Sequence, residues 1–239
     1  MSLADKLTEV AENVPKVYEA GKQAEYDAFW NAVQQNGNRR DYQYAFMRAS
    51  WTDDTFNPKY DLKPTNATAM FSTTYVTDLE SILKRNGIVL DTTECTSLNQ
   101  AFFSSSLTVL PEIVFTQKAT SVSQAFAYSA KIHTIRKLTF EEGFSMDPHQ
   151  NNLFLNCHAL AHVEFSGVLE KSINFQYSPL TLESAKSLIN ILKDFSGTST
   201  AGTKTVTFSS TTKNLLDAAG AIFNNMSWDV YLDSIGWTY

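Results

Sequence analysis

The sequence predicts an α/β fold in which the chain winds through stacked coils. The first observation is a near repeat: residues 96–102 and 120–126 match at five of seven positions, at an offset of 24. The second is a ladder of apolar pairs, three residues apart, that recurs at steps of 28, 25 and 28 residues: Leu79 with Ile82, Leu107 with Leu110, Ile132 with Ile135, and Leu160 with Val163. Periods of about 20 to 30 residues are typical of solenoids, and L-x-x-L spacing is typical of leucine-rich repeats. We therefore expect an irregular leucine-rich repeat solenoid with N-terminal helices and a mixed α/β C-terminal cap.

Length, charge and hydropathy narrow the class of protein. The 239 residues suit one large domain or a repeat domain with appended segments. The net charge is −6 and no basic tract alternates with aromatic residues, so nucleic acid is not an expected partner. The sequence has no apolar run of about 18 residues and no secretory signal, so we expect no membrane insertion. We expect a protein that is cytoplasmic when made and that would reach a virion or a cell surface by another route.

Residues 1–37 are expected to form helices. Their apolar residues step by four and three in a heptad pattern that Pro15 interrupts, which predicts one helix over residues 2–13 and a second over 15–35. Two roles are open. The helices either cap the exposed end of the repeats or form a self-associating stalk that would make the protein a homo-oligomer.

Residues 38–66 form an aromatic edge segment, for which we expect loops and short strands. Aromatic side chains recur along it and prolines punctuate it. They either pack at a domain junction or form a binding site, since Tyr and Trp are enriched where proteins bind partners. The candidate binding residues here are Tyr42, Tyr44 and Trp51.

Residues 67–180 hold the repeats. We expect a helix from residue 78 that Gly87 ends, a short strand over residues 88–91, and a loop over 141–151. Longer strands are expected over 107–115, 132–140 and 160–166, and three phenylalanines would fill the wide part of each coil: Phe102, Phe126 and Phe154. The two cysteines, Cys95 and Cys157, have similar sequence surroundings and are expected to be reduced and buried in equivalent repeat turns.

Residues 181–239 are expected to form the C-terminal cap. Thr181 can cap a helix with apolar residues at helical spacing, and residues 204–208 alternate as a strand does. Amphipathic helices are expected over residues 212–219 and 227–235.

No motif in the sequence points to catalysis. The segment from His158 to His162 has the spacing of a zinc protease motif, but Ala159 stands where the general base should be. The acidic pairs Asp53-Asp54 and Glu141-Glu142 suit a turn and a solvated loop. We therefore expect no catalytic residues, no metal and no cofactor.

The strand positions between the apolar anchors are expected to face outward and to bind a partner. The candidates there are Glu112, His133, Arg136, Lys137, His162 and Glu164. Their mixed charge favours a polar partner over a membrane or a nucleic acid. A solenoid presents such positions as one continuous surface.

The repeats resemble the BspA-like, or TpLRR, class of bacterial leucine-rich repeats. The resemblance rests on Cys95-Thr-Ser-Leu-Asn-Gln-Ala-Phe102, on residues 119–126 and on residues 154–165. The terminal segments 3–22 and 175–190 are similar to those of prophage-encoded, tail-associated proteins of Firmicutes, which implies a setting but no activity.

Three functions are open from the sequence. The first is a non-catalytic binding or adhesion module that recognises a protein or a glycan in a prophage or cell-surface setting. The second is a structural or assembly component of a phage tail with no ligand of its own. An enzyme is the third.

Overall fold

The computed structural model describes residues 24, 27, 28 and 30, and residues 40–49, 51–144 and 152–239. The described chain is a mixed α/β structure with parallel sheets. The predicted helices over 2–13 and 15–35 lie outside the described residues, apart from residues 24, 27, 28 and 30, which are helical. Residues 145–151 of the predicted loop also lie outside them.

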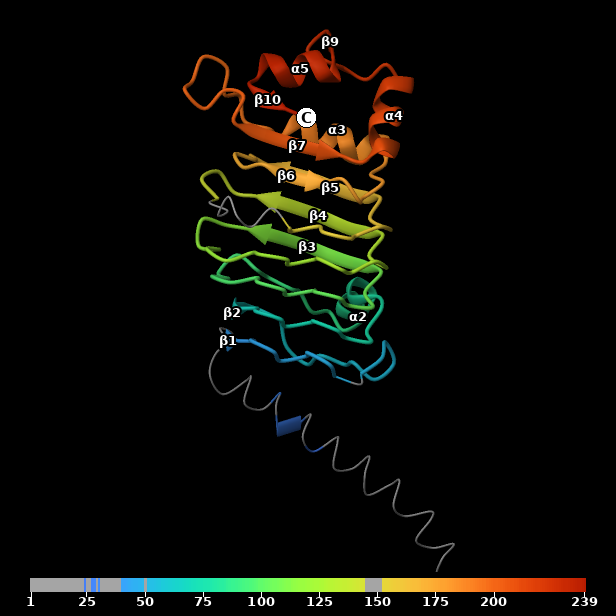
Figure 1. Cartoon of the computed structure of the whole chain (residues 1–239). Coiled ribbons are helices and arrows are strands. Elements are labelled where there is room, and N and C mark those ends of the chain that lie inside the picture. Colours follow the sequence, from blue (N-terminus) through green and yellow to red (C-terminus); the bar gives the residue numbers. More distant parts are fainter. Residues whose placement is uncertain (1–23, 25–26, 29, 31–39, 50, 145–151) are drawn as a thin grey trace, which may run out of the picture.

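The described strands and helices follow one another up the long axis of the molecule, as Figure 1 shows. In chain order they are β1 (Arg40–Asp41), β2 (Pro64–Asn66), α2 (Leu79–Arg85), β3 (Val109–Phe115), β4 (Thr134–Phe140), β5 (His162–Gly167), β6 (Ile173–Phe175), α3 (Leu182–Asn190), β7 (Lys204–Phe208), α4 (Ser210–Ala218), β8 (Ile222–Phe223), β9 (Met226–Ser227), α5 (Trp228–Ser234) and β10 (Trp237–Thr238). The three predicted long strands are therefore confirmed as β3, β4 and β5.

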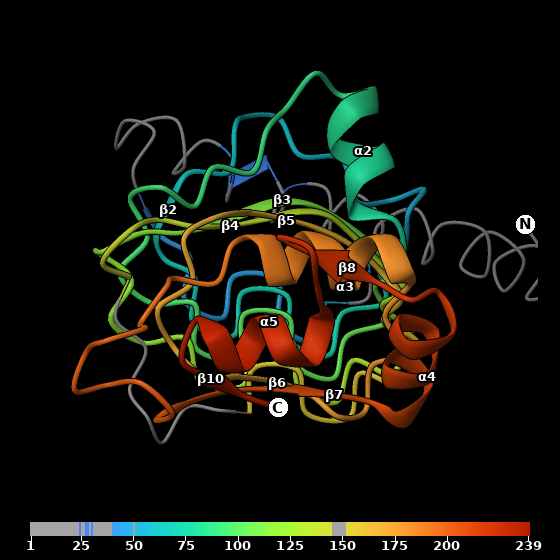
Figure 2. The same cartoon turned by 90° about the horizontal axis from the view of Figure 1, so that it is seen from above.

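Two parallel sheets lie on opposite sides of the core (Figure 2). One has the order β3-β4-β5 and the other the order β10-β7-β6. In the first sheet the inward anchors are in register, with Leu110 opposite Ile135 and Ile135 opposite Val163. Because the anchors of successive strands lie opposite each other, the apolar residues of each L-x-x-L pair are buried at the same depth. This explains the apolar ladder in the sequence.

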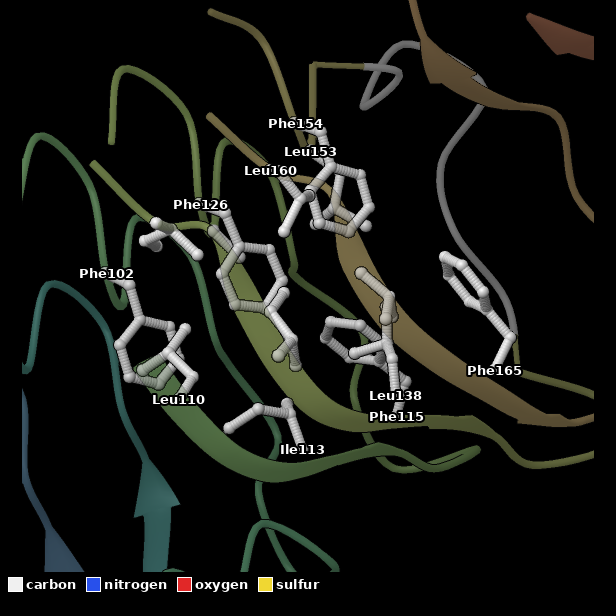
Figure 3. Close-up of a cluster of buried hydrophobic side chains, with 14 of the residues drawn as sticks. Phe102, Leu110, Ile113, Phe115, Phe126, Leu138, Leu153, Phe154, Leu160 and Phe165 are labelled. Atoms are coloured by element: carbon white, nitrogen blue, oxygen red, sulfur yellow. The ribbon is translucent and has the colours of Figure 1, made fainter. Parts of the chain in front are cut away.

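A column of phenylalanine rings faces this sheet across the core (Figure 3). Its members are Phe46, Phe71, Phe102, Phe126, Phe154 and Phe175, and the successive ring centroids are 4.9, 5.9, 5.4, 5.1 and 4.5 Å apart. Most of these rings are nearly parallel, and all six are buried. The predicted inward position of Phe102, Phe126 and Phe154 is therefore confirmed, and three more rings extend the column. We call the chain from one column ring to the next a rung.

Residues in the left-handed backbone region lie on both sides of the first four column rings. Gln100 and Ser104 flank Phe102 with φ of 56° and 49°, and Gln124 and Tyr128 flank the next ring with φ of 56° and 61°. Such backbone is costly for a residue with a Cβ, so its recurrence points to a repeated sharp bend of the chain.

The same bend occurs around Phe46, where Tyr44 and Arg48 have φ of 60° and 55°. The Phe46 ring also contacts the Phe71 ring, with centroids 4.9 Å apart. Residues 40–49 therefore bend around Phe46 as the later segments bend around their rings.

The helices begin where the sequence places capping residues. The side chain of Asp78 accepts a hydrogen bond from Ser81 N at 2.9 Å and starts α2. Thr181 Oγ1 accepts one from Ser184 N at 3.3 Å and starts α3. The predicted strand over residues 88–91 is wrong, because only Leu90 pairs there, through an isolated bridge to Leu62.

The C-terminal part continues the column. Phe175 stacks on Phe154 and pairs in β6 with Phe208 of β7. β7 covers residues 204–208 as predicted, and α4 and α5 match the predicted helices within two residues. Two features were not predicted: β10, which pairs with β7, and the β8–β9 hairpin, whose turn residues Asn224 and Asn225 have positive φ.

We predict that Gly167→Ala destabilises the fold far more than Gly87→Ala. Both glycines have positive φ, of 88° and 65°. A Cβ at Gly167 would lie 1.9 Å from the carbonyl oxygen of Phe140, whereas a Cβ at Gly87 would meet nothing within 4 Å. Left-handed backbone costs an alanine about 1–2 kcal/mol, and overpacking adds about 1–3 kcal/mol at Gly167 only. Urea denaturation measures both variants, and equal losses would show that β4 and β5 are not this close.

Candidate binding surface

The outward face of the β3–β5 sheet carries charges in neighbouring columns. Within each of β3 and β4, two residues stand between the buried anchors and point away from the core. They include Glu112 in β3, and they are Arg136 and Lys137 in β4. β5 has one residue fewer, so Glu164 lies opposite both cations of β4 at a bulge. The structure thus brings four of the predicted site residues onto one face.

Ion pairs cross this face between elements. Lys137 Nζ lies 3.3 Å from Glu112 Oε1, and the Thr139 hydroxyl lies 3.0 Å from the same oxygen. Arg136 Nε pairs with Glu80 in the first turn of α2, and this hydrogen bond raises the pKa of Arg136. Exposed pairs of this kind contribute little to stability, so the charges remain accessible to a partner. The Arg136 side chain is 63% exposed.

Of the two predicted histidines of this face, His162 begins β5 and His133 immediately precedes β4. His162 is exposed in the first position of β5 and is the strand partner of Thr134. His133 Nδ1 lies 2.8 Å from Thr134 Oγ1. His158 contacts Tyr177 instead, with ring centroids 5.5 Å apart. Within the described ranges, no group of three His, Cys, Asp or Glu residues is arranged to hold a metal ion.

An open depression of about 400 Å³ lies where the sheet meets α3. Strands β4 and β5 contribute Thr134, Arg136, His162 and Glu164 to its wall. The opposite wall comes from the start of α3 and contains Thr181, Glu183, Ser184 and Ser187. The depression is therefore lined by both signs of charge and by hydroxyl groups, which suits a hydrogen-bonding partner.

Hydroxyl groups of α3 close the free edge of the sheet. Ser184 Oγ accepts a hydrogen bond from Val163 N at 2.9 Å, and Ser187 Oγ accepts one from Phe165 N at 3.2 Å. At the other edge, Thr92 Oγ1 accepts a hydrogen bond from the amide of Val114 and donates one to the carbonyl of the same residue, each at 2.8 Å. An open edge would invite pairing with another chain, so these bonds keep the outward face, not the edge, as the accessible surface.

Sequence reasoning missed Ser184 and Ser187 of α3, which bond the edge of β5 and line the depression. Their i, i+3 spacing on a short helix after a strand is the available signal. That signal is weak, because only the packed structure shows which strand amides they meet.

The three aromatic candidates do not join this surface. Tyr42 is only 1% exposed and packs against Phe46 with ring centroids 6.1 Å apart, so its ring cannot meet a ligand. Trp51 is half-buried against Phe46 and Phe56. Tyr44 alone is well exposed, at 52%. All three lie in the segment after β1, and β1 lies below the β3–β5 sheet in Figure 1. As a binding residue Tyr42 was therefore predicted wrongly: its ring fills the core.

Both cysteines are free and buried, as predicted. Cys95 Sγ donates to the carbonyl of Ser97, and Cys157 Sγ donates to that of Phe126, each at 3.0 Å. Burial raises the pKa of Cys95 to about 11 and that of Cys157 to about 12, so neither is a thiolate at neutral pH.

The expected equivalence of the two cysteines is wrong. Ser97 pairs with Ser121, which aligns Cys95 with Ala119. Cys157 takes instead the place of Ser129, whose hydroxyl donates to the carbonyl of Phe102 as Cys157 does to that of Phe126. The two thiols occupy different columns of the stack.

No protein-family model, curated protein or solved structure matches this chain. Within the part of the chain that the structure describes, no helix combines the length and the apolar character needed to cross a bilayer.

We predict that Ser184→Ala costs about 1–3 kcal/mol of unfolding free energy. The change leaves the buried amide of Val163 without its acceptor, and an unsatisfied buried donor costs about that much. Ser210→Ala, at the exposed first position of α4, is the matched control and should stay within about 0.5 kcal/mol. Chemical denaturation measures both, and equal effects would show that α3 does not close the sheet.

Proposed function

We propose that the chain is a leucine-rich repeat solenoid of the BspA-like class that acts as a non-catalytic binding module. The in-register parallel pairing of β3, β4 and β5 and the column of six phenylalanine rings support the solenoid. The L-x-x-L layers supply the inward anchors of that pairing.

The observation that carries the binding function is the alignment of outward charges on one open face. Glu112, Lys137 and Glu164 alternate in sign across three neighbouring strands, and Arg136 stands beside them. Alternating charge gives no extended field of one sign, so this face suits a polar partner better than a nucleic acid or an anionic membrane. A protein or a glycan with complementary hydrogen-bonding groups is the partner that we propose.

The depression beside α3 makes this face concave at one end. It places Glu183 and the helix hydroxyls next to the strand residues, so that a partner on the strands also contacts α3. A prophage, phage-tail or cell-surface setting stays a prediction from the resemblance of the terminal segments.

We predict that Arg136→Ala with Lys137→Ala weakens partner binding by at least about fivefold at low salt. The two changes remove the cations of the face but touch no inward anchor, so the midpoint of thermal unfolding should not change. The binding of bacterial envelope proteins and polysaccharides, in separate fractions, is measured at low and moderate salt, because contacts between exposed charges fade as salt rises.

Lys131→Ala with Lys171→Ala is the matched control, because it removes the same charge outside the strands. This control should bind as the unchanged protein does. Equal binding by the two double variants would contradict the charged face as the site. An unchanged protein that binds neither fraction would favour a structural component of a phage tail.

A further inference from the structure

Most of the chain around the phenylalanine column carries no charged side chains. The first ring, Phe46, is the exception, because Asp41 and Arg48 lie close to it in the sequence. Charged residues make up 18% of the sequence, yet six segments contain no Asp, Glu, Lys or Arg: residues 64–77, 96–111, 119–130, 152–163, 172–182 and 205–212. Each segment contains one phenylalanine that stacks or pairs within the column. Charge resumes between these segments, as at Lys131, and in the middle of the strands of the β3–β5 face, as at Lys137 and Glu164. The column rings face these strands from across the core (Figure 3).

Exposed tyrosines stand in these uncharged segments. Tyr75 is 61% exposed, Tyr128 is 45% exposed and Tyr177 is 39% exposed. A solvent-facing surface ordinarily carries many charges, whereas surfaces that bind partners are depleted in charge and enriched in tyrosine. Depletion of charge and exposure of tyrosine therefore coincide in the same segments.

The aromatic side chains form a stripe across four successive rungs. Tyr128 contacts Phe103 of the rung before it, with ring centroids 5.3 Å apart. Tyr177 contacts His158 of the rung before it, at 5.5 Å. The two pairs are neighbours, because Tyr128 N donates to the carbonyl of Leu155 at 2.7 Å, three residues before His158.

The spacing of the two tyrosines follows from the stack. Tyr128 lies two residues after Phe126, and Tyr177 lies two residues after Phe175. One rung, with Asn156 at the corresponding position, separates them. Adjacent rungs are separated by about 4.8 Å, the distance between neighbouring strands, so two rungs place the tyrosines about 10 Å apart along the stack. A linear glycan repeats over a similar length each time its chain advances by two sugar rings.

Uncharged hydrogen-bonding groups also stand in these segments. Gln100 Nε2 donates to Gln124 Oε1 at 2.9 Å, which forms an amide ladder between adjacent rungs. Ser104 and Gln176 are exposed beside the tyrosines. Sugars without charge present hydroxyl groups and C–H faces, and these match amides, hydroxyls and aromatic rings. Nucleic acids and acidic polysaccharides would find no cation in these segments.

We propose that this tyrosine face, defined by Phe103, Tyr128, His158 and Tyr177, is a second binding surface and that it binds a neutral linear glycan. The glycan runs along the stack and places every second sugar ring against a tyrosine. The surface is separate from the charged face, so the two bind different ligands.

The full chain is tested by affinity electrophoresis in hydroxyethylcellulose, glycol chitin, galactomannan and alginate. We expect retardation by at least one of the uncharged polymers, which are hydroxyethylcellulose, glycol chitin and galactomannan. This retardation should be independent of salt, and alginate, which is acidic, should cause none. Tyr128→Asn with Tyr177→Ala should weaken the retardation by about tenfold, since each ring provides one stacking contact. Asn suits position 128, where φ is 61°, because Asn156 occupies the same place one rung later with φ of 59°.

Two further variants separate binding from folding. Tyr128→Phe with Tyr177→Phe keeps both rings and should retain most of the binding. This variant tests the role of the rings even if the first variant does not fold. Arg136→Ala with Lys137→Ala should bind the neutral polymers as the unchanged protein does, which separates this proposal from the charged face. No retardation by any neutral polymer, stronger retardation by alginate, or full binding without the two rings would each overturn the proposal.

Discussion

Stacking of phenylalanine rings at the spacing of adjacent strands is the constraint on which the rest of this structure depends. Each rung must place one ring at the same depth, next to the rings before and after it. The chain therefore bends sharply on both sides of the first four rings, and residues with a Cβ accept left-handed backbone there. Burial of a large aromatic side chain in every rung offsets that local cost.

The column also determines what the opposite face presents. Because each rung begins from a ring at a fixed position, the strands that follow meet in register, with Leu110 opposite Ile135. The outward residues between the anchors then fall into columns, and charge collects on the β3–β5 side. The ring side has a different composition, with tyrosines, amides and hydroxyls. One internal constraint thus produces two chemically different surfaces on opposite sides of the core.

The sequence predicts those parts of the fold in which short-range pattern and packing agree. Strands β3, β4 and β5 and helix α3 follow from L-x-x-L spacing and from a threonine cap, and Phe102, Phe126 and Phe154 follow from the near repeat. Phe46, Phe71 and Phe175 could not be placed in the column, because successive rings are 25, 31, 24, 28 and 21 residues apart and no fixed period connects them.

The candidate site was predictable in part for the same reason. Glu112, Arg136, Lys137 and Glu164 are outward because they stand between anchors. The burial of Tyr42 depends instead on contacts within the first rung, and an aromatic-rich segment has the same composition whether it packs inward or binds a ligand. Ser184 and Ser187 depend on the docking of α3 against β5, which no local pattern encodes.

A double-mutant cycle between Phe102 and Phe126 tests the ring column most directly. The unfolding free energies of Phe102→Leu, Phe126→Leu and the double variant give the coupling between the two rings, which are 5.4 Å apart. We expect a coupling of about 0.5–1.5 kcal/mol for this adjacent pair. Phe102 and Phe175, which are three rungs apart, should be additive within about 0.5 kcal/mol. An adjacent pair as additive as this distant pair would contradict the column as the interaction that organises the fold.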